Sequence, residues 1–240
     1  HGSSSTPTRL RASTAETRPA TAVDRVVIAD PPAESKANDP PRHSPGRSGM
    51  IGMHWVPTMT TRVKGPRLRT VPEGDNRERL VCPDCNYVAY ENPKVVVGVV
   101  ATWEDKLLMC RRAIEPRRGF WTLPAGFMEM SEHPEEGAAR EAWEEARAEL
   151  EIVDLLAVYS LRHISQLQLF YRAKLLSTNV SAGPESEEVG LFDFDALPST
   201  ELAFPSVHWA IQHFLEVREA SAFAPFGNPT GHTGRIQRGR

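Results

Sequence analysis

Cysteine is scarce in this sequence, and long apolar runs are missing from it. Three cysteines in 240 residues are too few for a disulfide framework. No stretch approaches the roughly 18 consecutive apolar residues that a membrane-spanning helix needs, so we expect a soluble protein without a membrane partner. Because 40% of its residues are hydrophobic, the chain can bury one substantial core, and we expect one main domain.

The N-terminal part of the chain lacks any hydrophobic period. It is rich in Ser, Thr, Ala, Pro and Arg, so we predict a long disordered segment over residues 1–77. Arg9, Arg11 and Arg18 stand among small residues with few acids, which is typical of an organellar transit peptide. The alternative is a cytoplasmic protein whose N-terminal residues are a low-complexity tail behind an added leader. This alternative is motivated by the start of the chain at His1 instead of methionine.

A basic excess is missing from most of the chain. Residues 1–70 carry 11 Lys and Arg against 5 Asp and Glu, whereas the whole chain has a net charge of −3, so the remainder is acidic by nine charges. A broad nucleic-acid footprint needs a basic face. We therefore expect no nucleic-acid partner.

A second cysteine pair is absent upstream of Cys82 and Cys85, which stand in a Cys-x-x-Cys motif. Such a knuckle supplies two of the four ligands of a structural zinc ribbon. His54 is the only nearby substitute, because Cys110 falls in a predicted strand and fits a small core residue. Two thiolates seldom hold zinc alone, so we predict a degenerate ribbon over residues 78–93, kept as a turn without structural Zn²⁺.

Hydrophobic patterning divides the rest of the chain into strands and helices. A valine-rich run and the segment after it predict a hairpin, and three alternating segments predict further strands, over residues 94–103, 106–112, 152–161, 166–176 and 189–194. One helix is predicted to begin near His133 and another at Pro205. This order indicates an α/β fold, an α/β/α sandwich with a mixed β-sheet over residues 94–218, followed by a flexible tail over residues 219–240.

The first of these helices carries a cluster of carboxylates. Glu141, Glu144 and Glu145 stand three and four residues apart on one face, where Arg140 can orient them. At an effective dielectric of about 20, two like charges about 4 Å apart cost on the order of 4 kcal/mol, and a divalent cation turns this repulsion into attraction. Oxygen ligands favour Mg²⁺ or Mn²⁺ over zinc. The alternative is an ordinary solvated, glutamate-rich helix face.

The residues around this cluster resemble the signature of the Nudix hydrolases. That signature, G-x5-E-x7-R-E-U-x-E-E-x-G-U, is matched at Gly126, Glu132, Arg140, Glu141, Glu144 and Glu145. Ala142 stands where a larger aliphatic residue is usual, and Arg147 replaces the last glycine. A residue other than glycine costs on the order of 1 kcal/mol in a left-handed conformation, so the helix can instead run on through residues 148–150. A catalytically silent family member is the alternative.

Segments outside the signature are similar to the plant chloroplast Nudix group that hydrolyses FAD and ADP-ribose. The likeness covers residues 78–217 and includes the Cys-x-x-Cys knuckle and the segments 90–98, 119–126 and 183–188. It implies a chloroplast enzyme that cuts FAD to AMP and FMN, or ADP-ribose to AMP and ribose 5-phosphate, with Mg²⁺ or Mn²⁺. NADH and CoA esters would be cut in the same way.

The resemblance also implies roles in a metal site. A metal-activated water would attack one phosphorus of the diphosphate. Glu141, Glu144 and Glu145 would bind the metal, and Arg140 would orient them. The loop before the helix would support its junction or the metal shell through Gly126 and Glu132.

A general base and a stacking surface for adenine are also needed. By resemblance to related ADP-ribose hydrolases, the candidate bases are Glu185 and Glu188. The alternative interpretation of these two residues is an acidic turn that faces solvent. Trp121, Phe120 and Tyr171 are candidates for stacking on adenine, although aromatic residues beside strands more often belong to the core.

Two other functions are compatible with these residues. The first is a Nudix enzyme for another substrate, such as a nucleoside triphosphate or capped RNA, although the catalytic region lacks a basic path for RNA. The second is a non-catalytic nucleotide-binding regulator, which Arg147 alone suggests. A homodimer is a further expectation, because dimers are common among relatives of this type.

Overall fold

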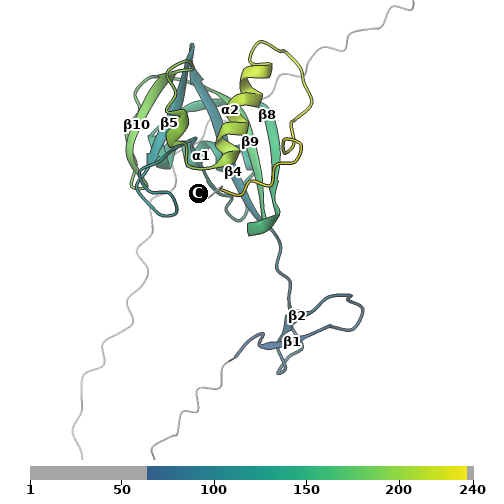
Figure 1. Cartoon of the computed structure of the whole chain (residues 1–240). Helices are drawn as coiled ribbons and strands as arrows, with labels where there is room; N and C mark the ends of the chain where they lie inside the picture. The colour runs from purple at the N-terminus through teal and green to yellow at the C-terminus, as the bar shows by residue number, and fades with distance from the viewer. Residues whose placement is uncertain (1–63, 237–240) are drawn as a thin grey trace, which may run out of the picture. The chain divides into compact units, whose positions relative to one another are not determined.

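The computed structural model describes residues 64–236, whose helices and strands are drawn in Figure 1. The predictions that concern residues 1–63, which include the transit peptide and most of the disordered segment, lie outside the described residues. The described residues form one sheet of three strands and one of seven. None of the helices within this range is long and apolar enough to cross a bilayer.

Five strands form the main path of the seven-stranded sheet, in the order β10-β5-β4-β9-β8. Their bounds are β4 (Lys94–Trp103), β5 (Lys106–Arg112), β8 (Leu150–Leu161), β9 (Gln166–Leu175) and β10 (Ser186–Asp193). The central strand β4 is parallel to β9, whereas the other neighbours along this path are antiparallel. The sheet is therefore mixed, and the five strands predicted from the sequence are confirmed.

Two short strands that the sequence analysis treated as loop also join this sheet. The strand β6 (Trp121–Thr122) pairs with β5, and β7 (Ala125–Phe127) pairs with β4. The second pairing sets Gly126 opposite Val97. The segment before the first helix is thus fixed to the centre of the sheet.

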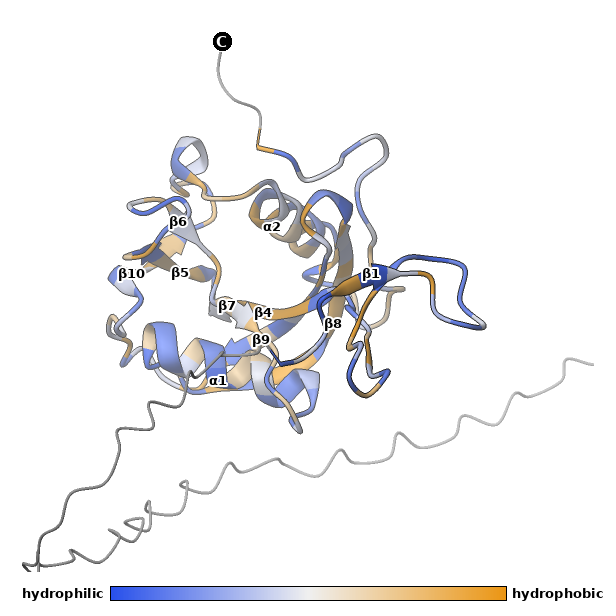
Figure 2. Ribbon diagram, turned by 90° about the horizontal axis from the view of Figure 1, so that it is seen from below, coloured by the Kyte–Doolittle hydropathy of each residue, from blue (hydrophilic) through white to orange (hydrophobic). Residues whose placement is uncertain are grey.

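One helix covers each face of this sheet, as Figure 2 shows. The helix α1 (Pro134–Ala146) packs against one face through residues such as Ala138, and α2 (Pro205–Val217) packs against the other. Successive residues of a strand point to opposite faces. Val97 therefore belongs to the core beneath α1, and Val100 to the core beneath α2. The predicted α/β/α sandwich is confirmed.

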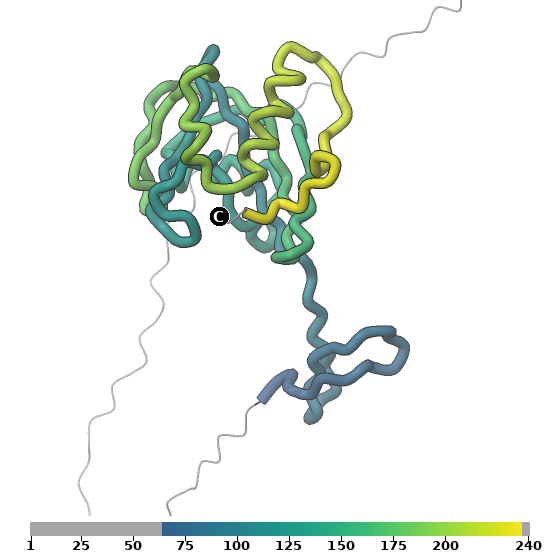
Figure 3. The backbone as a smooth tube through the Cα atoms, in the orientation of Figure 1, coloured from purple at the N-terminus to yellow at the C-terminus, as the bar shows by residue number. Residues whose placement is uncertain are grey.

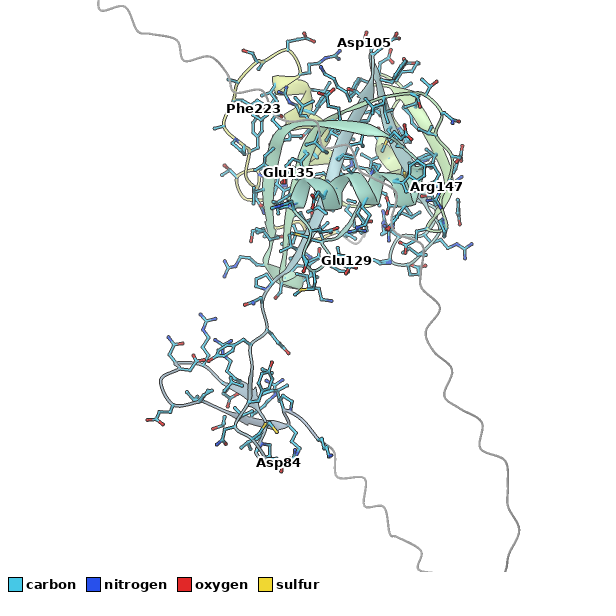
Figure 4. All side chains as sticks on the ribbon, turned by 180° about the vertical axis from the view of Figure 1, so that it is seen from behind. Asp84, Asp105, Glu129, Glu135, Arg147 and Phe223 are labelled. Atoms are coloured by element: carbon cyan, nitrogen blue, oxygen red, sulfur yellow. The ribbon has the colours of Figure 1, made fainter. Side chains whose placement is uncertain are left out.

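The residues at its ends set the limits of α1. Pro134 occupies the first helical position, as predicted. Arg147 follows the last helical residue in the left-handed conformation, with φ of 51°, and its N–H donates to the Trp143 carbonyl at 2.9 Å. Figure 4 shows Arg147 at this end of the helix. The helix stops at Ala146, so it does not run on through residues 148–150.

The segment after α2 is not the flexible tail that the sequence analysis predicted for residues 219–240. Its described part runs beside the edge strand β8, and it is the yellow segment of Figure 3. The Phe226 N–H donates to the Leu156 carbonyl at 2.9 Å, and the Val158 N–H donates to the Phe226 carbonyl at 2.8 Å. The Phe226 ring stacks on His213 of α2, with 4.2 Å between the ring centroids. Backbone pairing at the sheet edge and this stacking hold the segment in place.

The three-stranded sheet consists of β1 (Leu68–Thr70), β2 (Arg79–Val81) and β3 (Val88–Ala89), all antiparallel. The first strand lies inside the segment predicted to be disordered, so the predicted boundary at residue 77 is wrong. The Asn86 N–H donates to the Cys82 carbonyl at 2.8 Å and closes the turn between β2 and β3. The knuckle is therefore the tip of a small sheet and not an isolated turn.

Candidate active site

Arg140 of α1 ties together the acidic residues of the motif. Its Nε and Nη2 donate to the two carboxylate oxygens of Glu132, at 3.0 and 2.9 Å. Its Nη1 donates to Glu141 at 2.8 Å and to Glu144 at 3.1 Å, and Nη2 also donates to the Phe127 carbonyl at 3.0 Å. The guanidinium thus connects the loop after β7 with the helix, and it orients the carboxylates of both.

Glu132 belongs to the junction between that loop and α1. The N–H of Glu129, which is labelled in Figure 4, donates to Oε1 of Glu132 at 2.6 Å. The paired guanidinium of Arg140 is the main cause of a lowered pKa at Glu132, so this side chain stays ionised. Since both of its oxygens accept hydrogen bonds, Glu132 supports the junction between the loop and α1.

Glu141 and Glu145 are buried on α1, with exposed fractions of 9% and 6%, whereas Glu144 is exposed. Burial raises the pKa of Glu141 and brings that of Glu145 to about 8. The charge of Glu141 adds to the rise at Glu145, while a hydrogen bond from the Ala125 N–H at 3.3 Å opposes it. Two buried carboxylates that repel each other mark the centre of the site.

Two glycines allow the backbone to approach this centre. A Cβ on Gly126 would lie 2.2 Å from Oε2 of Glu141, and a Cβ on Gly183 would lie 1.7 Å from the carbonyl oxygen of Glu144. No other residue type fits at these distances without movement of the neighbouring group. The Gly183 N–H donates to the Glu145 carbonyl at 3.0 Å. The loop before β10 is thus closely packed against the end of α1.

This loop brings one of the two candidate bases to the centre. The Glu185 carbonyl accepts a hydrogen bond from the Ala113 N–H at 2.8 Å, and the negative charge of Glu185 contributes to the raised pKa of both Glu141 and Glu145. Glu188 instead lies within β10, where its carboxylate is 3.6 Å from Nη1 of Arg111. The negative charge of Glu185 therefore acts on both carboxylates, whereas Glu188 is paired with Arg111.

Two of the three aromatic candidates are core residues. Trp121 is buried and packs edge-on against Phe192, with 4.8 Å between the ring centroids. Tyr171 is buried in the core beneath α1, and burial raises its pKa to about 12. Phe120 is half-buried, and the guanidinium of Arg117 lies 3.6 Å from the centre of its ring. The predicted stacking roles of Trp121 and Tyr171 are wrong, because their rings are not accessible.

Arg112, at the end of β5, is a charged neighbour of Glu145 that the sequence did not point to. Its positive charge lowers the pKa of Glu145 and so offsets part of the rise that burial causes in that pKa. Its Nε donates to the Pro116 carbonyl at 2.9 Å, and its guanidinium lies 5.2 Å from the centre of the Phe204 ring. In the sequence, Arg112 is only a basic residue at the end of a predicted strand. No motif surrounds it that would have indicated a position near the carboxylates.

The donor set fits a divalent cation that prefers oxygen ligands. Within residues 64–236, no three His, Cys, Asp or Glu side chains converge closely enough to hold a metal ion as they stand. Mg²⁺ commonly needs only one or two carboxylates, because waters and substrate phosphates complete its shell. Glu141 and Glu145 offer such a pair, with Glu144 beside it, and a cation would relieve their mutual repulsion. These three residues would hold Mg²⁺ or Mn²⁺.

The zinc knuckle offers fewer ligands. Cys82 and Cys85 are free thiols, and a hydrogen bond from the Asp84 N–H is the main cause of a lowered pKa at Cys82. Arg67 Nη1 donates to the Asp84 carboxylate of the same turn at 2.8 Å. A structural zinc site needs four ligands, and the described residues around the knuckle supply only these two thiols. The described residues therefore do not complete a zinc site.

Two family models match this chain. The NUDIX domain matches residues 92–212, and the Nudix N-terminal model, a zinc ribbon, matches residues 64–91. The first covers the seven-stranded sheet with α1 and most of α2, and the second covers the three-stranded sheet. The predicted resemblance to Nudix hydrolases is therefore confirmed at the level of the family.

Individual relatives agree with this match. An ADP-ribose pyrophosphatase of Methanocaldococcus jannaschii is 31% identical over 124 residues, which cover 49% of this chain and 71% of that protein. A MutT-like protein of Streptomyces ambofaciens is 40% identical over 79 residues, which cover 33% of this chain and 49% of that protein. The chain thus spans about half the length of the second relative.

A solved structure supports the same assignment. The crystal structure of a NUDIX hydrolase from Nitrosomonas europaea is 48% identical, with a TM-score of 0.63, and the match covers 67% of this chain and 92% of that one. Fold, signature residues, family model and relatives all agree. The chain belongs to the Nudix family of hydrolases.

Proposed function

We propose that this chain hydrolyses the diphosphate bond of nucleoside diphosphate derivatives with Mg²⁺ or Mn²⁺, and that FAD and ADP-ribose are its substrates. The observation that carries the proposal is the buried pair Glu141 and Glu145 on α1: Glu141 packs against Gly126 and accepts a hydrogen bond from Arg140, and Glu145 accepts one from the Ala125 N–H. The name of the relative from Methanocaldococcus jannaschii, an ADP-ribose pyrophosphatase, supports the choice of substrate class.

Each side chain has a task in this reaction. A bound divalent cation would lower the pKa of a water and offset charge on the phosphate oxygens. Glu141 and Glu145 would hold the cation, and Arg140 keeps Glu141 in position through its hydrogen bond of 2.8 Å. Arg112 supplies positive charge near the pair, which stabilises the negative charge that develops on a phosphate as the bond breaks.

Glu185 would accept the proton of the attacking water. The water oxygen forms a bond to one phosphorus, and the bridging oxygen leaves with the other phosphate. FAD thereby gives AMP and FMN, and ADP-ribose gives AMP and ribose 5-phosphate. The base is assigned to Glu185 because its charge is felt at both inner carboxylates.

Glutamine substitutions test these assignments, because they remove charge with little change in shape. Glu144→Gln and Glu145→Gln should each lower kcat for AMP release at least about a hundredfold, since positioned ionised groups contribute about that much. Glu185→Gln should lose more activity than Glu188→Gln. Glu149→Gln, an exposed control beyond the helix, should keep the wild-type rate. Full activity in Glu145→Gln would show that the metal assignment is wrong.

A further inference from the structure

The Cys-x-x-Cys knuckle has no task in the proposed hydrolysis. It forms the turn between β2 and β3, where Figure 4 labels Asp84. Neither of its thiols is in a disulfide. The chain has one further cysteine, Cys110, which is 1% exposed in β5 of the other sheet. With three cysteines in all, one chain cannot build a site of four thiolates, so the two thiols of the knuckle are available for other chemistry.

Backbone hydrogen bonds close the turn that carries the two cysteines. The Asn86 N–H donates to the Cys82 carbonyl at 2.8 Å, and the Cys82 N–H donates to the Tyr87 carbonyl at 2.8 Å. Asn86 takes the left-handed conformation with φ of 58°, which asparagine adopts more readily than most residues. The backbone thus shapes the knuckle by its own hydrogen bonds, and the thiols take no part in them.

An ion pair ties the same turn to the segment before β1. The Arg67 N–H donates to the Val81 carbonyl at 3.1 Å. Its Nη1 donates to the Asp84 carboxylate at 2.8 Å and to the Gly65 carbonyl at 3.2 Å. In a structural zinc site the metal links the segments that carry its ligands. Here Arg67 links the segment before β1 to the knuckle, so the two cysteines are not required for that link.

The two sulfur atoms are neighbours within the turn. The Cys82 sulfur accepts a hydrogen bond from the Cys85 thiol, and it also accepts hydrogen bonds from the N–H groups of Asp84 and Cys85. The ends of a four-residue turn lie within about 7 Å of each other, which is near the upper end of the Cα separations that disulfides span. Side-chain rotation can therefore bring the two sulfurs to the disulfide bond length of about 2.05 Å. The N–H donors stabilise the thiolate form, which is the nucleophile in disulfide exchange.

The two thiols differ in their access to solvent. Cys82 is 4% exposed, whereas Cys85 is exposed. Both line an open depression of about 770 Å³, to which Lys64, Pro66 and Tyr87 also contribute. This volume falls within the range of small-molecule sites, which is about 300 to 1,000 Å³. A small molecule can therefore reach the Cys85 sulfur directly, while the Cys82 sulfur is reached from Cys85.

We propose that Cys82 and Cys85 are a redox-active dithiol, which a low-molecular-weight disulfide such as oxidised glutathione converts to an internal disulfide. The Cys85 sulfur attacks one sulfur of the small disulfide, forms a mixed disulfide and releases one small thiol. The Cys82 sulfur then attacks the Cys85 sulfur and releases the second small thiol. Two electrons pass from the pair to the small disulfide, and the two protons leave on the two small thiols. This assignment does not rest on the proposed hydrolysis.

Peptide mass spectrometry follows this conversion. The full chain is reduced, freed of metal by a chelator and incubated with oxidised glutathione, and the remaining thiols are alkylated before digestion with trypsin. Cleavage after Arg79 and Lys94 releases one peptide that contains both cysteines. In the wild type this peptide should lack two hydrogen atoms and carry neither an alkyl group nor glutathione. A reducing agent should restore two thiols that can be alkylated.

Single substitutions distinguish the two cysteines by their order of reaction. Cys82→Ser should accumulate the mixed disulfide between glutathione and Cys85, because no second thiol displaces the glutathione. In Cys85→Ser, the buried Cys82 should react with oxidised glutathione at least about tenfold more slowly than Cys85 does in Cys82→Ser. Cys110→Ser is the matched control and should form the same internal disulfide as the wild type, because Cys110 lies in the other sheet.

Elemental analysis of the full chain before chelation tests the competing role of the thiols as metal ligands. We expect no stoichiometric zinc. One zinc per chain, or one zinc per two chains together with a doubled mass in light scattering, would show that the thiols are ligands and would overturn the proposal. Two alkylated thiols after incubation with oxidised glutathione would overturn it as well. So would a wild-type chain that stops at the mixed disulfide on Cys85.

Discussion

Arg147 departs from the Nudix signature, yet it takes the backbone conformation that the usual glycine would take. Its φ and ψ are 51° and 30°, and this left-handed conformation costs on the order of 1 kcal/mol for a residue with a Cβ. The guanidinium lies 5.7 Å from the centre of the Trp143 ring and donates to the Trp143 carbonyl at 3.3 Å, which offsets part of that cost. The substitution therefore affects the cap of α1 and not the carboxylates.

Paired substitutions at this position separate backbone strain from side-chain contacts. Arg147→Gly and Arg147→Ala both remove the guanidinium, but only glycine relieves the left-handed conformation. We expect Arg147→Gly to be the more stable of the two by about 1 kcal/mol in denaturant unfolding. Both variants should keep the kcat of the wild type. Equal stability of the two variants would contradict the assignment of a strained cap.

His213 is a second residue whose environment has a measurable consequence. Its Nδ1 lies 2.7 Å from the Tyr159 hydroxyl, and its ring stacks on Phe226. Burial lowers its pKa, and the charge of Glu216 opposes this shift only in part. The folded state therefore holds a neutral imidazole that would take up a proton more readily in the unfolded chain.

This difference predicts the direction of the pH dependence. Neutral His213 contributes its full share to the free energy of unfolding above the ordinary histidine pKa of about 6.5. This contribution is lost as the pH falls below that value, because the unfolded state then binds a proton that the folded state does not. The free energy of unfolding should decrease from about pH 6.5 toward pH 5, with a further contribution from His208, whose pKa is also lowered by burial. His213→Gln should show a shallower decrease. An unchanged slope in that variant would contradict the buried neutral state.

Among the secondary-structure elements, the long strands and both helices could be predicted because each repeats a pattern over many residues. The strands β6 and β7 have only two and three residues, which is too short for any period to show. The segment after α2 was missed for another reason. Phe226 is held by backbone bonds to β8, and the identities of Pro, Gly and Asn around it resemble those of a loop.

Phe226 offers a test of whether this segment is part of the folded domain. Phe226→Ala would remove the stacking on His213 and should lower the free energy of unfolding by about 2 kcal/mol, below the range for a fully buried phenylalanine. Ser221→Ala, an exposed change in the same segment, is the control and should unfold like the wild type. If Phe226→Ala also unfolds like the wild type, the segment does not contribute to stability.

For the molecule as a unit, the sequence predicted the acidic centre better than what surrounds it. The spacing of Glu141, Glu144 and Glu145 on one helix is local, so it could be recognised without a structure. Arg112 lies at the end of β5 and Glu185 in the loop before β10, and only the fold shows that both charges act on Glu145. The candidates Trp121 and Tyr171 failed for the converse reason, since local sequence does not distinguish a core ring from an accessible one.

The most direct test is the release of AMP, followed by chromatography, from FAD, ADP-ribose, NADH, a nucleoside triphosphate and a capped RNA. Each substrate is incubated with the full chain in Mg²⁺ and, separately, in chelator. The account predicts AMP from FAD or ADP-ribose that depends on Mg²⁺ and disappears in Glu145→Gln. If no substrate yields product in Mg²⁺, or if the rate is the same in chelator, the assignment of a metal-dependent diphosphatase is contradicted.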